Sequence, residues 1–423
     1  MTDDAVKALT VAADAARRYA ASIKDRRVFP DAGALSALDA FDESLPERAT
    51  PPEETIALLD RAGSPASVAT TGGRYFGFVT GGALPAALAA DWLVSAWDQP
   101  ALAPVAGPGV AAIEKVAARW TLDALHLPPF MSVVFPSSAS FGTLIGLAAA
   151  RRAVLLRQGW DVDERGLAGA PKFRIVVSAE AHSTLIKGLG VLGLGRSAAE
   201  IVPVDEEGRL RADLLPPLDE TTIVCAQAGN VNSGAFDPLD HIAEKARAGG
   251  AWLHVDGAFG LWARASKRFA PLASGAEKAD SLTADGHKWL NTPYDCGISI
   301  VRDRTMLTGA LSLAAAYLPA EETPPAKDCL IELSRRGRGV TVWAALRSLG
   351  RQGLSDMIER CCDHARAIAG GLEALGYEIH NEVALNQIVA SFGDKARTDA
   401  IRLDVERSGE AWAGPTNWRG WRR

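Results

Sequence analysis

The sequence predicts an α/β protein with a mainly parallel central sheet covered by helices and a smaller C-terminal α+β domain. Short apolar, β-rich runs alternate with segments of helical periodicity through the middle third of the chain. These runs are continuously apolar, which is typical of strands buried on both faces. With 423 residues, the chain is long enough for two or three domains.

The N-terminal part is expected to be helical. Residues 1–24 carry apolar side chains at helical spacing, and the acidic, proline-containing stretch that follows is typical of a connecting arm. Further helices are predicted over about 83–97 and 109–126. We therefore assign residues 1–60 to an N-terminal helical arm.

Seven predicted strands define a large α/β domain over residues 61–305. They lie at 131–135, 173–178, 200–204, 221–226, 251–256, 281–285 and 298–302. The remaining residues, 306–423, are assigned to the small C-terminal domain. This part is predicted to contain a loop, two helices at about 338–352 and 354–375, and strand-like runs near 377–392.

Composition and charge exclude several classes of protein. The chain is 48% hydrophobic with a net charge of −6, and it has no basic block, so neither nucleic acid nor an anionic membrane is expected as a partner. Its five cysteines have no zinc-site spacing, so we expect reduced thiols and no metal. No apolar run approaches about 18 residues, and the N-terminus lacks the apolar core of a signal peptide. These observations indicate a cytoplasmic protein.

The densest polar cluster follows two of the predicted strands. Asp256 ends one strand, and Lys288 comes 32 residues later (288 − 256), after a strand that ends at Asp285. Strands of one sheet can aim a carboxylate and an amine into one crevice. Pyridoxal 5'-phosphate (PLP) needs this pair, because a lysine binds its aldehyde as an imine and a carboxylate keeps its pyridine nitrogen protonated. The alternative is that Asp256 is an ordinary strand-end residue and Lys288 a surface lysine. The neighbouring His287, Trp289 and Asn291 make this alternative weaker.

A phosphate site is predicted in the segment FPSSASFGTLIGLAAAR, where small hydroxyl residues lie between a strand and a helix. Backbone N–H groups at a helix start bind phosphate, and His287 can add a donor. Simple N-capping by serine is the alternative interpretation.

Four further candidates follow strands or lie in a loop. His182 opens a helix, where a flat imidazole can stack on a cofactor ring, although a lone histidine is more often structural. Asn230 and Asn232 lie in a loop after a strand, and turn formation is the alternative. Tyr317 lies in a proline- and acid-rich segment, from which a phenol can donate a proton on loop closure, and an ordinary surface tyrosine is the alternative.

Together these residues resemble the group II PLP-dependent amino-acid decarboxylases, the family that acts on aromatic amino acids, aspartate and glutamate. HVDGAFG followed by ADGHKWLN carries the resemblance most specifically, and the likeness extends from about Arg74 to the C-terminus. The resemblance implies fold-type I, the PLP-dependent transferase-like fold. It also implies a homodimer with active sites at the subunit interface.

The resemblance also implies a role for each candidate residue. Lys288 would bind the cofactor aldehyde, Asp256 would pair with the pyridine nitrogen, and Ala258 would pack under the ring. The remaining roles are phosphate binding by Ala139, Ser140 and His287, ring stacking by His182, cofactor contacts by Asn230 and Asp285, a substrate contact by Thr80 and loop catalysis by Tyr317.

Three departures from the family pattern are visible. Phe141 replaces an acidic residue or Met, and Pro100 stands where Asn is commoner. Relatives also continue for some tens of residues beyond the TNWRG stretch, whereas this sequence ends at Arg423. The small domain is therefore expected to be incomplete.

We expect decarboxylation of an L-amino acid, with aromatic substrates slightly preferred, through an external aldimine and a quinonoid. Asp256 would stabilise the quinonoid, and Tyr317, or His182 through water, would reprotonate the α-carbon. Two alternatives stay open. One is other PLP chemistry, namely aminotransfer, carbon–carbon lysis or decarboxylation coupled to oxidative deamination. The other is an inactive homologue that binds a partner.

Overall fold

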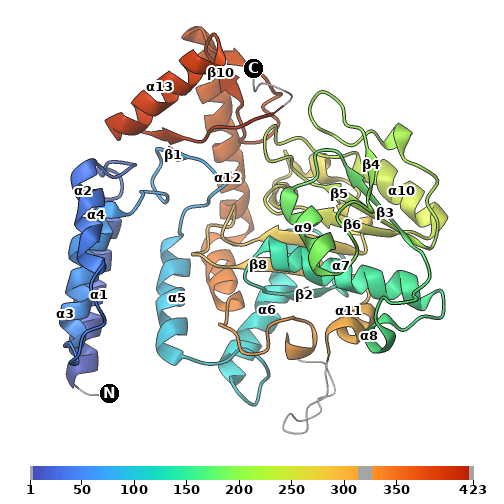
Figure 1. Cartoon of the computed structure of the whole chain (residues 1–423), viewed down its shortest axis with the longest axis horizontal. Coiled ribbons are helices and arrows are strands. Elements are labelled where there is room, and N and C mark those ends of the chain that lie inside the picture. The colour runs from blue at the N-terminus through green and yellow to red at the C-terminus, as the bar shows by residue number, and fades with distance from the viewer. Residues whose placement is uncertain (1–2, 313–325, 419–423) are drawn as a thin grey trace. The chain divides into compact units, whose positions relative to one another are not determined.

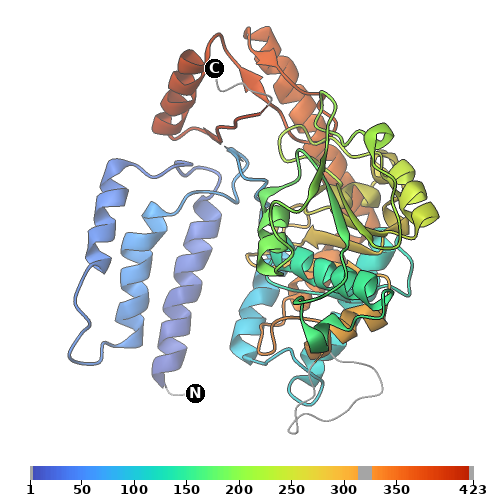
Figure 2. The same cartoon turned by 45° about the vertical axis from the view of Figure 1, so that its right-hand side comes forward.

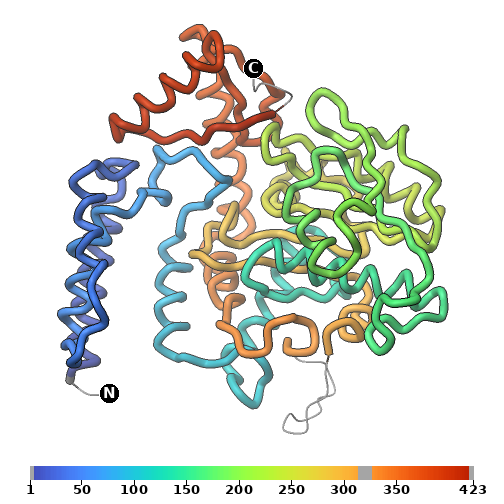
Figure 3. Tube along the Cα trace, in the orientation of Figure 1, coloured from blue at the N-terminus to red at the C-terminus, as the bar shows by residue number. Residues whose placement is uncertain are grey.

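The computed structural model describes residues 3–312 and 326–418, and it divides into two compact units. Unit 1 contains Met1–Gly82 and Ser391–Arg423, and unit 2 contains Ala83–Ala390. Figure 3 shows that unit 1 takes its residues from both ends of the colour ramp, whereas unit 2 is the continuous middle of the chain. The predicted boundaries at 60 and 305 lie elsewhere, and the three-domain assignment stays a prediction.

Unit 1 combines N-terminal helices with a C-terminal helix and strand. Helix α1 (Asp3–Ser22) packs along α3 (Pro52–Leu58), as Figure 2 shows. Strand β1 (Tyr75–Phe76) pairs in parallel with β11 (Trp412–Ala413). The other helices of the unit are α2 (Ala32–Ser36), α4 (Ser64–Ala66) and α13 (Lys395–Ser408).

Unit 2 is built on a seven-stranded sheet with the order β2-β8-β7-β6-β5-β3-β4 (Figure 1). The strands are β2 (Ser132–Val134), β3 (Arg174–Ser178), β4 (Glu200–Val202), β5 (Thr222–Gln227), β6 (Trp252–Asp256), β7 (Ser281–Asp285) and β8 (Gly297–Val301). The strands β4, β3, β5, β6 and β7 are mutually parallel. Only the pairs β7–β8 and β2–β8 are antiparallel among the pairs of this sheet. The predicted α/β class with a mainly parallel sheet is therefore confirmed.

Helices surround this sheet in unit 2. They are α5 (Pro85–Trp97), α6 (Pro108–Ala124), α7 (Ala139–Leu156), α8 (Val162–Arg165), α9 (Ser183–Val191), α10 (Leu239–Gly249), α11 (Arg304–Leu311) and α12 (Gly339–Ala374). The two helices predicted near 338–352 and 354–375 are the two halves of α12, which is interrupted at Gly350, where φ is +61°. The strand-like runs predicted near 377–392 shrink to β9 (Glu378–Ile379) and β10 (Ala390–Ser391), which pair with each other.

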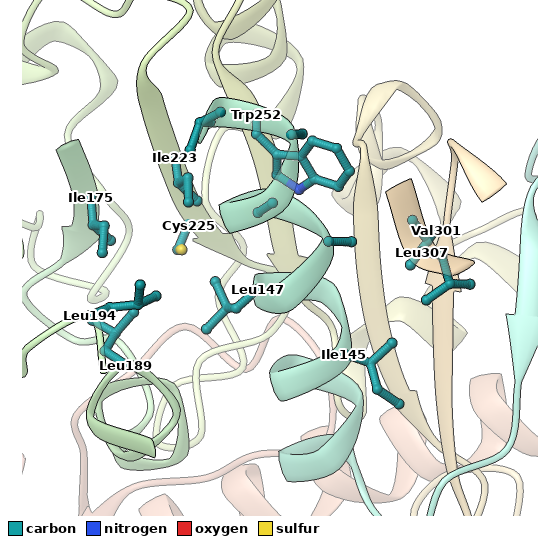
Figure 4. Close-up of a cluster of buried hydrophobic side chains, with 14 of the residues drawn as sticks. Ile145, Leu147, Ile175, Leu189, Leu194, Ile223, Cys225, Trp252, Val301 and Leu307 are labelled. Carbon is teal, nitrogen blue, oxygen red and sulfur yellow. The ribbon is translucent and has the colours of Figure 1, made fainter. Parts of the chain in front are cut away.

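Helix α7 is the central helix of the unit 2 core. It contacts β6, β7 and β8 as well as the helices α9 and α11, and Figure 4 shows Ile145 and Leu147 of this helix among the buried side chains. By length and composition it is the one described helix that could cross a membrane, although it contains Arg151 and Arg152. However, 67% of its 18-residue window is buried inside the protein, as expected for a core helix. The expectation that the chain does not span a membrane stays a prediction.

Candidate active site

The predicted site residues of unit 2 gather at one edge of the sheet. The strands β3, β5, β6 and β7 are parallel, so their carboxyl ends lie at the same edge. Strand β2 is antiparallel to β8, which is antiparallel to β7, so β2 ends at this edge too. The residues that follow these five strand ends are Ala139 and Ser140 after β2, His182 after β3, Asn230 after β5, Asp256 and Ala258 at the end of β6, and Asp285, His287 and Lys288 at the end of β7. This edge is where open α/β sheets bind their ligands.

Asp285 is the centre of the most closely connected group at this edge. Its Oδ1 accepts the Ala139 N–H at 2.6 Å, and its Oδ2 lies 3.2 Å from Lys288 Nζ and 3.6 Å from His287 Nε2. The Asp285 carboxyl is only 2% exposed. Burial raises its pKa, while the charges of Lys288 and His287 and the Ala139 N–H act in the opposite direction. The structure thus brings the predicted aldehyde-binding lysine beside the first residue of α7.

The orientation of His287 is set by a backbone hydrogen bond. The Cys296 N–H donates to His287 Nδ1 at 3.0 Å, so the neutral ring carries its proton on Nε2, the atom that faces Asp285. Burial lowers the pKa of His287, and the Asp285 carboxylate opposes this shift. The ring also stacks on Tyr294, with centroids 4.4 Å apart. His287 is therefore held rigidly, with one N–H directed into the group around Asp285.

Asp256 and His182 line one small pocket, together with Gln227 and Cys225. The Ala258 N–H donates to Asp256 Oδ1 at 3.1 Å, which fixes the carboxylate at the end of β6. His182 caps α9, because its Nδ1 accepts the Thr184 N–H. The structure therefore brings together the two residues predicted to contact the nitrogen and the face of the cofactor ring.

The first turn of α7 has backbone N–H groups that Ser138 does not cap, although the Asp285 carboxylate accepts one of them, the Ala139 N–H. Ser138, the residue before the helix, is extended (φ −160°), and its hydroxyl makes no capping hydrogen bond. Serine at this position was the basis of the alternative N-cap interpretation, so the structure does not support that alternative. A helix start beside a lysine, with the Asp256 carboxylate on the neighbouring strand, provides groups that fit the phosphate, aldehyde and pyridine nitrogen of PLP.

For three other predicted residues, the structure does not test the predicted role. Asn230 is 1% exposed, and its Oδ1 accepts the N–H groups of Asn232 and Ser233, as a turn-forming residue does. Its Nδ2 is buried without a hydrogen-bond partner among the described residues. Thr80 belongs to unit 1, where its N–H donates to Gly77 O, and Tyr317 lies outside the described residues. The roles predicted for these three stay predictions.

Sequence reasoning missed His254 and its partners. This imidazole is fully buried two residues before Asp256 on β6, and its Nδ1 lies 2.9 Å from Ser281 Oγ on β7. Burial lowers its pKa to about 4, against the raising effect of Asp256. The sequence did contain a signal for this histidine. His254 comes two residues before Asp256 on one predicted strand, and alternate residues of a strand face the same side of a sheet.

Known proteins resemble this chain in sequence and in fold. Residues 41–392 match the model of the pyridoxal-dependent decarboxylase conserved domain. The chain is 29% identical over 382 residues to tryptophan decarboxylase 1 of Oryza sativa subsp. japonica, covering 84% of this chain and 74% of that protein. It is also 29% identical over 345 residues to an aromatic-L-amino-acid decarboxylase of Bacillus atrophaeus, covering 78% and 69% respectively. The crystal structure of Oryza sativa TDC with PLP and tryptamine superposes with a TM-score of 0.89 at 25% identity, covering 99% of this chain and 92% of that chain.

The fold and the site therefore define a PLP-dependent carboxy-lyase. The chain belongs to the pyridoxal-dependent decarboxylase family, and its cofactor is pyridoxal phosphate.

Proposed function

We propose that this enzyme decarboxylates an L-amino acid, with aromatic substrates slightly preferred, and that Lys288 and Asp256 hold the cofactor. The observation that carries the proposal is the grouping of Lys288 and the α7 N-terminus around the Asp285 carboxylate. Asp256 ends the neighbouring strand at the same edge of the sheet. The names of the two relatives, a tryptophan and an aromatic-amino-acid decarboxylase, support an aromatic substrate.

When bound, PLP supplies an electron-accepting ring that stabilises the negative charge left at the substrate α-carbon after CO2 departs. The protein's part is to bind, orient and move protons. The Lys288 amine binds the cofactor aldehyde, the Asp256 carboxylate keeps a proton on the pyridine nitrogen, and the first turn of α7 binds the phosphate. His182 covers the ring from α9. In this proposal, Tyr317 or His182 returns a proton to the α-carbon.

The proposal is tested by mixing the purified chain with PLP and each L-amino acid, including 2,4-diaminobutyrate. We expect release of CO2 and the matching amine, with the highest kcat/KM for an aromatic substrate. A keto acid, ammonia or an aldehyde in place of the amine would indicate one of the other PLP reactions. Absence of both turnover and PLP absorbance would contradict the proposal and favour a binding protein.

Lys288→Ala tests the assignment of the lysine. We expect it to abolish the visible absorbance of protein-bound PLP and to lower CO2 release roughly 10³-fold or more, because the group that binds the aldehyde is lost. Lys245→Ala is the matched control, because Lys245 donates to Ala212 O from α10 and belongs to no part of the proposed site. Equal loss in both variants would contradict the assignment. The homodimer and the cytoplasmic location stay proposals.

A further inference from the structure

A row of polar side chains lies between the sheet and the first two turns of α7. Alternate residues of a strand point to the same face, so Trp252, His254 and Asp256 of β6 share one face. Ser281, Thr283 and Asp285 of β7 form the adjacent row, because His254 pairs with Ser281 and Asp256 with Thr283. Five of these six side chains are buried, and Asp256 is partly exposed.

Hydrogen bonds connect this row from the core to α7. The Trp252 indole N–H donates to Ser281 Oγ at 2.9 Å, and Ser281 Oγ lies 2.9 Å from His254 Nδ1. His254 Nε2 lies 3.4 Å from Thr283 Oγ1, which lies 3.4 Å from Thr143 Oγ1 on α7.

One continuous arrangement of donors and acceptors satisfies these four contacts, and it starts from the donor-only indole. Since Ser281 accepts from Trp252, its own hydroxyl proton is free to point to His254 Nδ1, and the neutral His254 then carries its proton on Nε2. That N–H points to Thr283, whose hydroxyl proton in turn points to Thr143.

Glycines let α7 approach this row closely. A Cβ added to Gly142 would lie 2.2 Å from Thr283 Cγ2, and one added to Gly146 would lie 2.8 Å from His254 Nδ1. A Cβ on Gly297, where β8 begins, would lie 2.3 Å from the carbonyl carbon of Ser138, just before the helix. The start of α7 is therefore held at a short, fixed distance from β6, β7 and β8.

We propose that His254, acting through Thr283 and Thr143, is a positioning residue that sets the first turn of α7 relative to Asp256. The row ends at two groups assigned to the cofactor. Asp256, two residues after His254 on β6, is assigned to the pyridine nitrogen. Asp285 accepts the N–H of Ala139 at the start of α7, which is assigned to the phosphate. An apolar core would pack helix on sheet without directional contacts, whereas a satisfied polar network specifies one register. This inference rests on the proposed roles of Asp256 and the α7 N-terminus.

Thr143→Val and Thr283→Val test the inference, because each keeps the side-chain shape and removes one hydroxyl. The readout is the Kd for PLP, measured by absorbance titration without substrate. We expect each variant to raise this Kd roughly three- to tenfold, which is the size of one net hydrogen bond. The double variant should raise it no more than either single one, because both remove the same link. Thr143→Ser should restore a Kd near that of the wild type.

Thr121→Val is the matched control. Thr121 is fully buried in α6 and donates to Ala117 O, so this variant should lower the Tm and leave the Kd unchanged. An unchanged Kd in the Thr143→Val and Thr283→Val variants, or an equal rise in Thr121→Val, would overturn the inference. If one of the two variants does not fold, the other decides alone. A failure of the proposed function differs from these results, because wild-type protein would then show no Lys288-dependent absorbance.

Discussion

At the scale of single residues, the site depends on side chains whose ionisation is set by burial. Asp285 is surrounded by a helix N-terminus, a lysine and a histidine, and His287 is oriented by the Cys296 N–H. The contact between Ala139 and Asp285 cannot be predicted from the motif ADGHKWLN, because Ala139 comes 146 residues before Asp285. The sequence predicted that these residues form a site, and the structure shows which of their atoms face each other.

His254 should make stability depend on pH. Burial lowers its folded pKa to about 4 from 6.5, so between these values the unfolded chain binds a proton that the folded chain does not. The free energy of unfolding should therefore fall by roughly 3 kcal/mol as pH drops from 6.5 to 4. His254→Gln, which cannot titrate, should lack this contribution. Urea unfolding at pH 4.5, 5.5 and 7 measures the difference, and identical losses in wild type and variant would contradict the prediction.

At the scale of elements, the periodicity of the sequence located the strands well. The run predicted at 281–285 is β7, and the run at 251–256 is β6 within one residue. Strand direction was harder to predict, because a short apolar run has the same sequence pattern in a parallel strand such as β6 and in an antiparallel strand such as β8. The break of α12 at Gly350 was foreseen only as a gap between two helices.

The close contact of α7 with the sheet predicts unequal effects of two glycine substitutions. Gly142→Ala should lower the free energy of unfolding by about 1–3 kcal/mol, because its Cβ would overlap Thr283. Gly371→Ala, on an open surface of α12 with no atom within 4 Å, should raise it by about 0.5–1 kcal/mol by stiffening the unfolded chain. Denaturant unfolding of both variants measures the contrast. A Gly142→Ala protein as stable as the wild type would show that α7 can shift away from β7.

At the scale of the whole molecule, the two ends of the sequence share unit 1. The ring of Trp412 stacks on Tyr75 with centroids 4.9 Å apart, and a Cβ on Gly77 would lie 1.9 Å from Trp412 Cζ3. Arg74 extends the junction, because its guanidinium donates to Glu410 O and to Arg26 O. The sequence predicted an N-terminal arm and a separate C-terminal domain, and it held no signal for these contacts.

Trp412→Ala should therefore destabilise unit 1 selectively. Loss of the buried indole should lower the stability of this unit by about 3 kcal/mol and expose residues 1–82 to protease. Limited proteolysis followed by mass spectrometry should show early cuts there, while unit 2 stays intact. Trp160→Ala, in unit 2, is the control and should not increase those cuts. Simultaneous cleavage of both units in the Trp412→Ala protein would argue against separate stability.

The sequence by itself determined the family of this protein and its cofactor. HVDGAFG and ADGHKWLN place a carboxylate, a histidine and a lysine at the ends of two strands, and strand periodicity is a local property that nearby residues encode. Only the tertiary structure decided that Asp285 binds the start of α7, that His254 connects to Thr143, and that Trp412 packs on Tyr75. These contacts join residues far apart in the chain, and their geometry exists only once the helices have packed on the sheet.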